Sequence, residues 1–444
     1  MISSKNIFFA CWCWPQKWID RIFLAMTSLI PTAMIFGQGY ADAMLTLIGI
    51  AFLVRSAITR YWAWARESWF LLAMLLWVWL IFISFFAVID FNASISRALL
   101  WIRFVVFIAA LKEWILNDQK YRRTAALFIA ACIFITIISL WKQFIFGDTL
   151  HGISSSDSGR LSGPFKDWIA GTFLAKVIMP VLGIATAAII AMIDKRSIRI
   201  GLIYLLAIAL LVSVLITGER IAFLSLALSV VIFFASLKNL RRGLFIPIAL
   251  GITLGSAALS LSPSIKSRMI DDTIFQLASF SDSHYGMIFS NAASMIEDYP
   301  LTGVGLKNYR QVCRQEGYRW FKNDPANCGL HPHNPYLEWA AESGIPGLLL
   351  FIVLMALMIV RMIKAHRNIT VDNYPFALGA LLSLIPFLWP LMSSMSLFTN
   401  WNAIMFWYAL AFAFSFTQSV STVNLDSAIS PRKTKYSKKN YMVT

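Results

Sequence analysis

Two histidines stand close together near the end of the longest polar segment of the chain, residues 263–347. His331 and His333 are separated by one proline, and Asn334 follows His333 directly. Imidazole has an unperturbed pKa of about 6.5, so it is the usual general base at neutral pH. We therefore take His333 as the candidate base, and His331 and Asn334 beside it as candidate substrate-binding residues. A plain surface role and a zinc site are the alternatives, although a His-x-His pair without a third ligand is weak evidence for zinc.

Two glutamates follow the histidines at a spacing of four residues, Glu338 and Glu342. Residues at this spacing share one face of a helix, so the two carboxylates would point the same way. Either could orient a histidine or act as a base itself. Helix capping and exposure to water are the alternative roles. Glu338, the nearer of the two, is a candidate substrate-binding residue.

Arginines at two earlier positions indicate a site for an anion. Arg160 lies in the polar segment 147–167, and Arg220 follows Gly218 and Glu219 at a turn. A guanidinium group can bind phosphate through two parallel hydrogen bonds. We therefore expect Arg160 and Arg220 to hold a membrane-borne phosphate or diphosphate at the level of the lipid headgroups.

Three further cations fall within or beside apolar segments: Arg97, Arg103 and Lys176. A cation in hydrocarbon costs about 2.5–3.5 kcal/mol on insertion scales, so such residues tend to face a cavity or a counter-charge. Structural pairing and extension of the side chain to the headgroups are the alternatives. We assign Arg97 to a structural role and leave Arg103 and Lys176 open between the two.

The composition places the chain among membrane proteins. Of 444 residues, 59% are hydrophobic and 14% are charged, and the mean hydropathy is +0.69. Repeated apolar runs of about 20 residues are long enough to cross the hydrocarbon core as helices. The net charge of +16 is explained by basic cytoplasmic loops, so it does not indicate nucleic acid. The expected fold class is an all-α polytopic membrane protein.

The apolar runs predict about twelve transmembrane helices, with one large polar loop between the ninth and the tenth. The predicted spans are 18–37, 41–54, 68–89, 95–116, 124–146, 168–193, 199–217, 221–237, 243–262, 345–363, 374–393 and 397–418. The second is short for a full crossing.

The distribution of lysine and arginine predicts the orientation. Every short loop that this layout assigns to one side carries at least three positive charges, which marks that side as cytoplasmic. Both termini are then cytoplasmic, and the large loop is periplasmic in a bacterial cell. The chain divides into residues 1–262 with the first nine helices, the loop 263–346, residues 347–418 with the last three helices, and a basic tail, 419–444, expected to be disordered.

The outward loop carries two further local signals. Residues 284–299 place apolar side chains at helical spacing before Pro300, which predicts an amphipathic helix that ends there. Cys313 and Cys328 lie in a compartment that permits disulfides. A bridge between them would stabilise the fold by about 3 kcal/mol in the entropy model, and two free thiols are the alternative.

These residues, in this order, resemble the O-antigen ligase and polymerase superfamily of bacterial envelope glycosyltransferases. The ligase motif is His-Asn, nine residues, then Gly-x-x-Gly, and it matches His333-Asn334 followed by Gly344-Ile345-Pro346-Gly347. The supporting matches are Arg160 in Arg-Leu-Ser-Gly-Pro-Phe, Arg220 after Thr-Gly-Glu, and Pro-Leu-Thr-Gly-Val-Gly over 300–305. The layout of twelve spans with one large periplasmic loop also fits this superfamily.

The resemblance implies a metal-independent enzyme of the inner membrane that needs no cofactor. Family members use glycans carried on undecaprenyl diphosphate, so the implied partners are this donor and, as acceptor, lipid A–core or another lipid-linked glycan. Arg160 and Arg220 would neutralise the departing diphosphate, and His333 would take the proton of the acceptor hydroxyl. A single displacement would invert the anomeric configuration.

One family feature is missing at its usual place. Many members carry an arginine shortly before the loop helix, where this chain has Ser283-His284-Tyr285. Arg268 and His284 are the candidates to fill that role.

Three rival functions remain at this point. The acceptor can be another lipid-linked repeat unit, as in a polymerase, or an exported protein, as in an O-glycosyltransferase. A transporter for lipid-linked glycans is the rival of a different class. It would need charged residues along a path through the spans, whereas the polar groups here gather on one face, which favours an enzyme.

Overall fold

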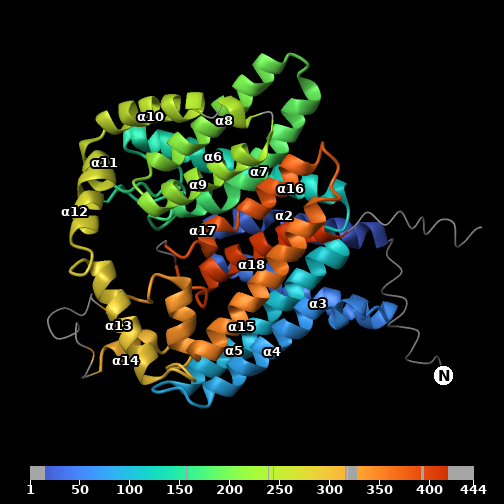
Figure 1. The fold of residues 1–444 in the computed structure, drawn as a ribbon. Helices are drawn as coiled ribbons and strands as arrows, with labels where there is room; N and C mark the ends of the chain where they lie inside the picture. The colour runs from blue at the N-terminus through green and yellow to red at the C-terminus, as the bar shows by residue number, and fades with distance from the viewer. Residues whose placement is uncertain are drawn as a thin grey trace, which may run out of the picture.

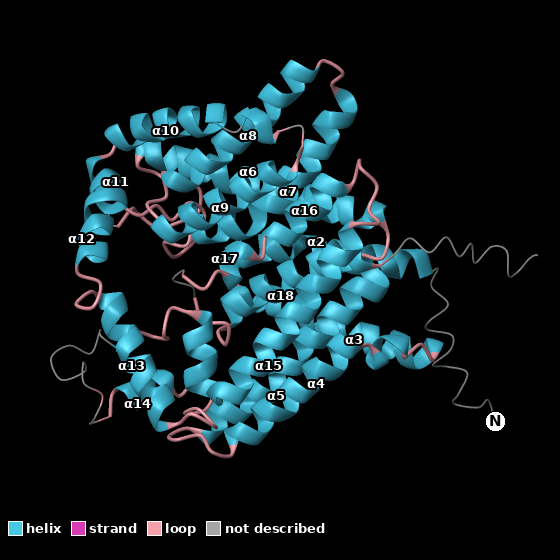
Figure 2. Ribbon diagram, viewed as in Figure 1, coloured by secondary structure: helices cyan, strands magenta, loops and turns pink. Residues whose placement is uncertain are grey.

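The computed structural model describes residues 16–156, 159–238, 240–243, 245–315, 318, 328–391 and 395–418. Every regular element in these residues is a helix (Figure 1, Figure 2). The predicted all-α class is therefore confirmed for the described part of the chain. The tail 419–444, predicted to be disordered, lies outside it.

Each predicted span overlaps a helix, and the eleventh is divided between two. These helices are α2 (Gln16–Phe36), α3 (Gln38–Thr59), α4 (Ser68–Ser84), α5 (Phe91–Ala110), α6 (Gln119–Phe146), α7 (Ala170–Met192), α8 (Arg196–Leu215), α9 (Arg220–Ser236), α10 (Phe245–Ser260), α15 (Pro335–His366), α16 (Tyr374–Leu382), α17 (Ile385–Leu388) and α18 (Asn400–Phe414).

Among the described residues, seven stretches are long and apolar enough to cross a membrane by length and composition. They correspond to α2, α3, α5 with the π-helical turn Leu111–Ile115, α6, α7, α8 and α15. The stretches 68–84, 220–236 and 374–388 are shorter apolar helices. The helices thus agree with a polytopic membrane protein, while the number twelve stays a prediction.

Helix α18 is the most completely buried element. All of its residues from Trp401 to Phe414 are buried, as expected for a helix that is apolar on every side. Its Trp407 stacks on Phe104 of α5, with ring centroids 5.8 Å apart, and meets Trp101 edge-on at 5.3 Å. Helices α5 and α18 are therefore held together by aromatic packing near the centre of the protein.

The polar insert between α10 and α15 forms a row of short helices along one side of the bundle (Figure 1). They are α11 (Pro263–Lys266), the π-helical turn Ser267–Asp271, α12 (Asp272–Ala278), α13 (His284–Asp298) and α14 (Tyr309–Cys313). Helix α13 is the predicted amphipathic helix, and it ends just before Pro300 as expected. Its apolar face forms a second, smaller core with α14, which contains Ile288, Met295, Tyr309 and Val312.

The end of the insert is tied to this smaller core by a disulfide. Cys313 and Cys328 are bonded, with their Cα atoms 5.7 Å apart, and both are fully buried. The bridge joins the end of α14 to the residues that lead into His331.

On the side predicted to be cytoplasmic, three segments meet at one carboxylate. Glu67, before α4, accepts hydrogen bonds from Lys112 at the end of α5 and from Arg361 of α15, the latter at 2.9 Å. The positive-inside count assigned all three to the same side, and their contact in the structure is consistent with that assignment.

Candidate functional site

Three arginines from three separate segments meet beside a tight turn before α9. The N–H of Leu161, next to Arg160, donates to the carbonyl oxygen of Thr217 at 3.2 Å. Arg268 of the polar insert donates its Nε–H to the carbonyl oxygen of Gly218 at 2.9 Å. The turn that carries Arg220 is therefore bound on one side by the 147–167 segment and on the other by the insert.

Two glycines allow this close approach. Gly159 and Gly218 have positive φ values of 75° and 70°, a backbone region that favours glycine. A Cβ atom at Gly218 would lie 3.0 Å from the carbonyl oxygen of Gly159. A larger residue at Gly218 would push the two arginine-bearing segments apart.

The arginine side chains are half-buried and only partly neutralised. Arg220 Nη1 donates to the hydroxyl of Thr273 on α12 at 3.2 Å. Burial lowers the pKa of Arg268, and the positive charges of Arg160 and Arg220 lower it further. An arginine stays protonated in proteins, so this electrostatic repulsion shows that three positive charges lie close together. Such a cluster attracts an anion.

The one carboxylate within ion-pair distance of this cluster, among the described residues, has another role. Glu219 lies 3.8 Å from Arg160 Nη2. Its carboxylate is buried and accepts hydrogen bonds from the backbone N–H groups of Gly171 and Thr172, at 2.7 and 3.1 Å. These are the first N–H groups of α7, which have no partners within the helix. Glu219 therefore caps α7 and leaves much of the arginine charge available.

His333 stands in an unusual backbone conformation at the start of α15. Its φ is +54°, which a residue other than glycine adopts only where its surroundings enforce it. The ring packs against that of His331 at 4.1 Å and edge-on against Tyr285 at 5.7 Å between centroids. Burial lowers the pKa of His333 to about 4, and the nearby His284 contributes to the shift. The imidazole is therefore neutral at pH 7 and able to accept a proton.

Asn334 fixes this histidine in place by capping α15. Its Oδ1 accepts from the N–H groups of Tyr336 and Leu337, at 3.0 and 3.2 Å. Its Nδ2 donates to the carbonyl oxygen of Pro390 at 2.8 Å. Because the side-chain amide is committed to these contacts, Asn334 is placed to position His333. The sequence suggested substrate contact for Asn334.

The Gly-x-x-Gly motif makes a kink that sets the direction of α15. Gly344 has a φ of +73° inside the helix, and Pro346 has no backbone N–H to donate. A Cβ atom at Gly344 would lie 2.1 Å from the carbonyl oxygen of Leu301. At Gly303 a Cβ atom would lie 2.5 Å from the backbone of Glu342. The Gly344–Gly347 motif and the Pro-Leu-Thr-Gly-Val-Gly segment, residues 300–305, therefore pack backbone against backbone. We call these the two glycine motifs.

The kink frees the carbonyl groups of Ala341, Glu342 and Ser343 from the helix, and each finds a new donor. In that order the donors are Val304 N–H at 2.8 Å, Gly305 N–H at 3.1 Å and Trp79 Nε1 at 3.0 Å. The N–H of Ile345 donates in turn to the carbonyl of Pro300 at 2.8 Å. Since buried backbone groups need partners, the two motifs depend on each other.

Both glutamates of α15 are buried and bind loop backbone. Glu342 accepts from the N–H of Lys307 at 2.8 Å, and Glu338 accepts from the N–H of Leu397 at 2.8 Å. The second oxygen of Glu338 has no hydrogen-bond partner within the described residues. Holding loops is thus a role that the sequence did not suggest for either.

The two candidates for the missing loop arginine occupy different places. Arg268 joins the arginine cluster, while His284 is the exposed first residue of α13 and acts electrostatically on His333. Tyr285, the next residue of α13, contacts the ring of His333. The sequence indicated Tyr285 only as an apolar position of an amphipathic helix.

No group of three His, Cys, Asp or Glu residues close enough to hold a metal ion occurs in the described part of the chain. The His-x-His pair thus has no third ligand of these types among the described residues.

Comparison with known families places much of this site in one matched region. Residues 205–352 match the family described as O-antigen ligase, and no curated protein sequence matches the chain. The match includes Arg220, Arg268, His333 and the Gly344–Gly347 motif, while Arg160 lies before it. The resemblance inferred from the motifs is confirmed for residues 205–352, which are similar to the O-antigen ligase family, whose members are membrane glycosyltransferase-like enzymes.

Proposed function

We propose that this protein is a periplasmic-face glycosyltransferase of the inner membrane that moves a glycan from undecaprenyl diphosphate to lipid A–core. The observations that support this proposal are a half-buried histidine, His333, held just before α15, and a cluster of three arginines at the turn before α9. One part of the site suits a base and the other suits a diphosphate.

The arginine cluster would act on the leaving group. When the bond between the anomeric carbon and the diphosphate oxygen breaks, the electron pair stays on the diphosphate and adds negative charge there. Arg160, Arg220 and Arg268 come from segments that are already fixed by backbone hydrogen bonds. Positive groups that are held in advance stabilise such charge without reorganisation.

His333 would act on the acceptor. Its imidazole takes the proton as the acceptor hydroxyl oxygen forms the new bond to the anomeric carbon, opposite the departing diphosphate. This single displacement inverts the configuration at that carbon. Asn334 would keep the ring aligned through the cap of α15.

The acceptor distinguishes the proposal from its nearest alternatives, the polymerase and the protein O-glycosyltransferase. The test is reconstitution of the purified full-length protein in liposomes with an undecaprenyl-diphosphate glycan. Lipid A–core, excess donor or an exported protein is then offered as acceptor. The proposal predicts glycan attached to lipid A–core, detected by mass spectrometry of the lipid product. Chain growth on undecaprenyl diphosphate alone would instead identify a polymerase.

A further inference from the structure

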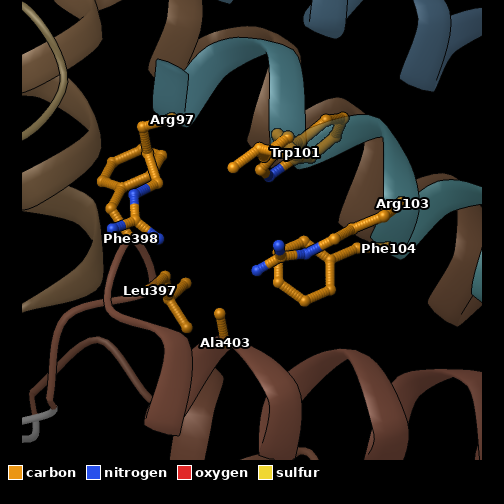
Figure 3. Close-up of a pocket in the computed structure, with 8 residues that line it drawn as sticks. Arg97, Trp101, Arg103, Phe104, Leu397, Phe398 and Ala403 are labelled. Carbon is orange, nitrogen blue, oxygen red and sulfur yellow. The ribbon is translucent and has the colours of Figure 1, made fainter. Parts of the chain in front are cut away.

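Two arginines outside the three-arginine cluster line a small cavity between α5 and α18. Arg97 and Arg103 extend from α5 toward Leu397, Phe398 and Ala403, which lie on α18 and the segment before it (Figure 3). The cavity has a volume of about 10 Å³. That is about the room that one water-sized oxygen atom needs.

Both guanidinium groups converge on the same neutral atom. Arg97 Nη1 and Arg103 Nη2 donate to Oδ1 of Asn400, Arg103 at 3.3 Å. Arg103 also pairs with Asp42 of α3 at 2.9 Å. Its Nε–H is buried and has no acceptor among the described residues. The pair therefore keeps donor capacity that the protein does not use.

The charges around the pair do not balance at close range. Arg97 has no carboxylate within ion-pair distance in the described part of the chain, and Asp42, the ion-pair partner of Arg103, acts on Arg97 only from farther away. Glu342 lies farther from Arg97 and accepts from the backbone of Lys307. The N-terminus of α18 adds partial positive charge, because Thr399 makes no side-chain cap there. An anion at the cavity would balance this excess.

One lining residue of the cavity, Leu100, is exposed, and we take this apolar side as the mouth of the cavity. Leu100 lines the cavity and is 52% exposed, and the neighbouring Leu99 is 48% exposed. Both lie in the stretch Phe91–Ile115, one of those long and apolar enough to span a membrane. The surroundings of this mouth are then lipid, so a ligand reaches the arginines from within the bilayer and not from water.

We propose that Arg97 and Arg103 bind the phosphate group of a membrane lipid. One phosphate oxygen would occupy the cavity and accept from the unused Nε–H of Arg103. The remaining oxygens would lie at the mouth, within reach of the planar donors of Arg97. The predicted orientation places this site in the outer half of the membrane. The inference rests on other residues than the proposed transferase site, so either can fail alone.

The test is native mass spectrometry of the purified full-length protein in detergent, titrated with phosphatidylglycerol. We expect one tightly held lipid, and a loss of affinity of about tenfold or more in Arg97→Gln and Arg103→Gln, as for a lost charged hydrogen bond. Arg310→Gln removes the same charge from an exposed position on α14 and should bind like the unaltered protein. Equal binding by all four proteins would overturn the proposal.

Two further arms identify the source of the phosphate and guard against misfolded variants. Leu100→Trp keeps both arginines and obstructs only the exposed mouth, so it should weaken lipid binding while the melting temperature stays unchanged. Inorganic phosphate should compete poorly with phosphatidylglycerol. Inorganic phosphate that displaces the lipid at equal concentration, or Leu100→Trp that binds normally, would contradict a lipid-borne ligand.

Discussion

The guanidinium of Arg268 donates its Nε–H to the carbonyl oxygen of Gly218, 2.9 Å away. This hydrogen bond joins the polar insert to the turn before α9, two segments that are 50 residues apart along the chain. The two terminal nitrogens of Arg268 take no part in that bond, and the charges of Arg160 and Arg220 act on this guanidinium.

Replacing the arginines by lysine should separate charge from geometry. In Arg160→Lys and Arg220→Lys the positive charge remains but the planar pair of donors is lost. We expect transfer rates about tenfold or more below those of the unaltered protein, since one charged hydrogen bond contributes about 1.5–3 kcal/mol. Initial rates at saturating acceptor would measure this. Arg310→Lys is the matched control, and normal rates in both cluster variants would rule out this diphosphate site.

Removal of the base should abolish most transfer without affecting insertion. His333→Ala takes away the proton acceptor, for which a loss of about 10²–10⁴-fold is typical. The assay is glycan attachment in cells that lack their own copy, with membrane levels checked by immunoblot. His151→Ala, in an outward loop, is the control. Attachment at the normal level in His333→Ala would remove His333 as the base.

The environment of His333 predicts how activity depends on pH. Its folded pKa is lowered to about 4, so the neutral form persists as the pH falls through 6.5 and is lost only near 4. We expect kcat/KM to stay level from pH 7 to about 5 and to decline below that. The bound diphosphate would raise the pKa of His333, so kcat should decline at a higher pH than kcat/KM. A decline of kcat/KM already at pH 6.5 or above would contradict this prediction.

The kink in α15 should tolerate no side chain at its centre. Gly344→Ala places a Cβ atom 2.1 Å from the carbonyl of Leu301, in a backbone conformation strained for alanine. We expect a destabilisation of about 2 kcal/mol or more, measured as a lower melting temperature of the purified protein. Gly201→Ala is the control, because a Cβ atom there meets nothing within 4 Å. Equal melting temperatures would show that the packing of the two glycine motifs is not needed.

Chelation distinguishes the arginine mechanism from a metal-dependent one. If arginines supply the positive charge, transfer by the purified protein should proceed at an unchanged rate after dialysis against EDTA. A loss of activity that zinc restores would support the alternative role of His331 and His333 as metal ligands.

The positions of the helices could be predicted because the hydropathy of each segment depends only on its own residues. The structure places a helix at each predicted span. The break between α16 and α17 was missed, because Ser383 is a single polar residue in an otherwise apolar run. The charge count put Arg160, Arg220 and His333 on one face without any knowledge of their contacts. The sequence could not decide whether Arg268 or His284 takes the role of the missing loop arginine. That role depends on how the polar insert folds onto the turn before α9.

The roles of the polar residues around the site depended on contacts that no local pattern reveals. Glu338 and Glu342 share a helix face as their spacing predicts, but they bind the backbones of Leu397 and Lys307. Asn334 matches a motif that sequence alone reads as part of the chemistry, whereas its hydrogen bonds place it in a cap. In the proposed mechanism, His333 of the motif is the base, and Asn334 holds it in position.

The kink at Gly344 divides α15 into parts with different mechanical attachments. Ala341 and Glu342, before the kink, bind the 300–305 turn through their carbonyl groups, and Ile345, just after it, binds Pro300 through its N–H. The long part beyond Ile345 packs within the bundle. A tilt of the long part, as lipids of different thickness would impose, can be taken up at the joint. The short part, which begins beside His333, would then keep its place on the 300–305 turn while the long part tilts.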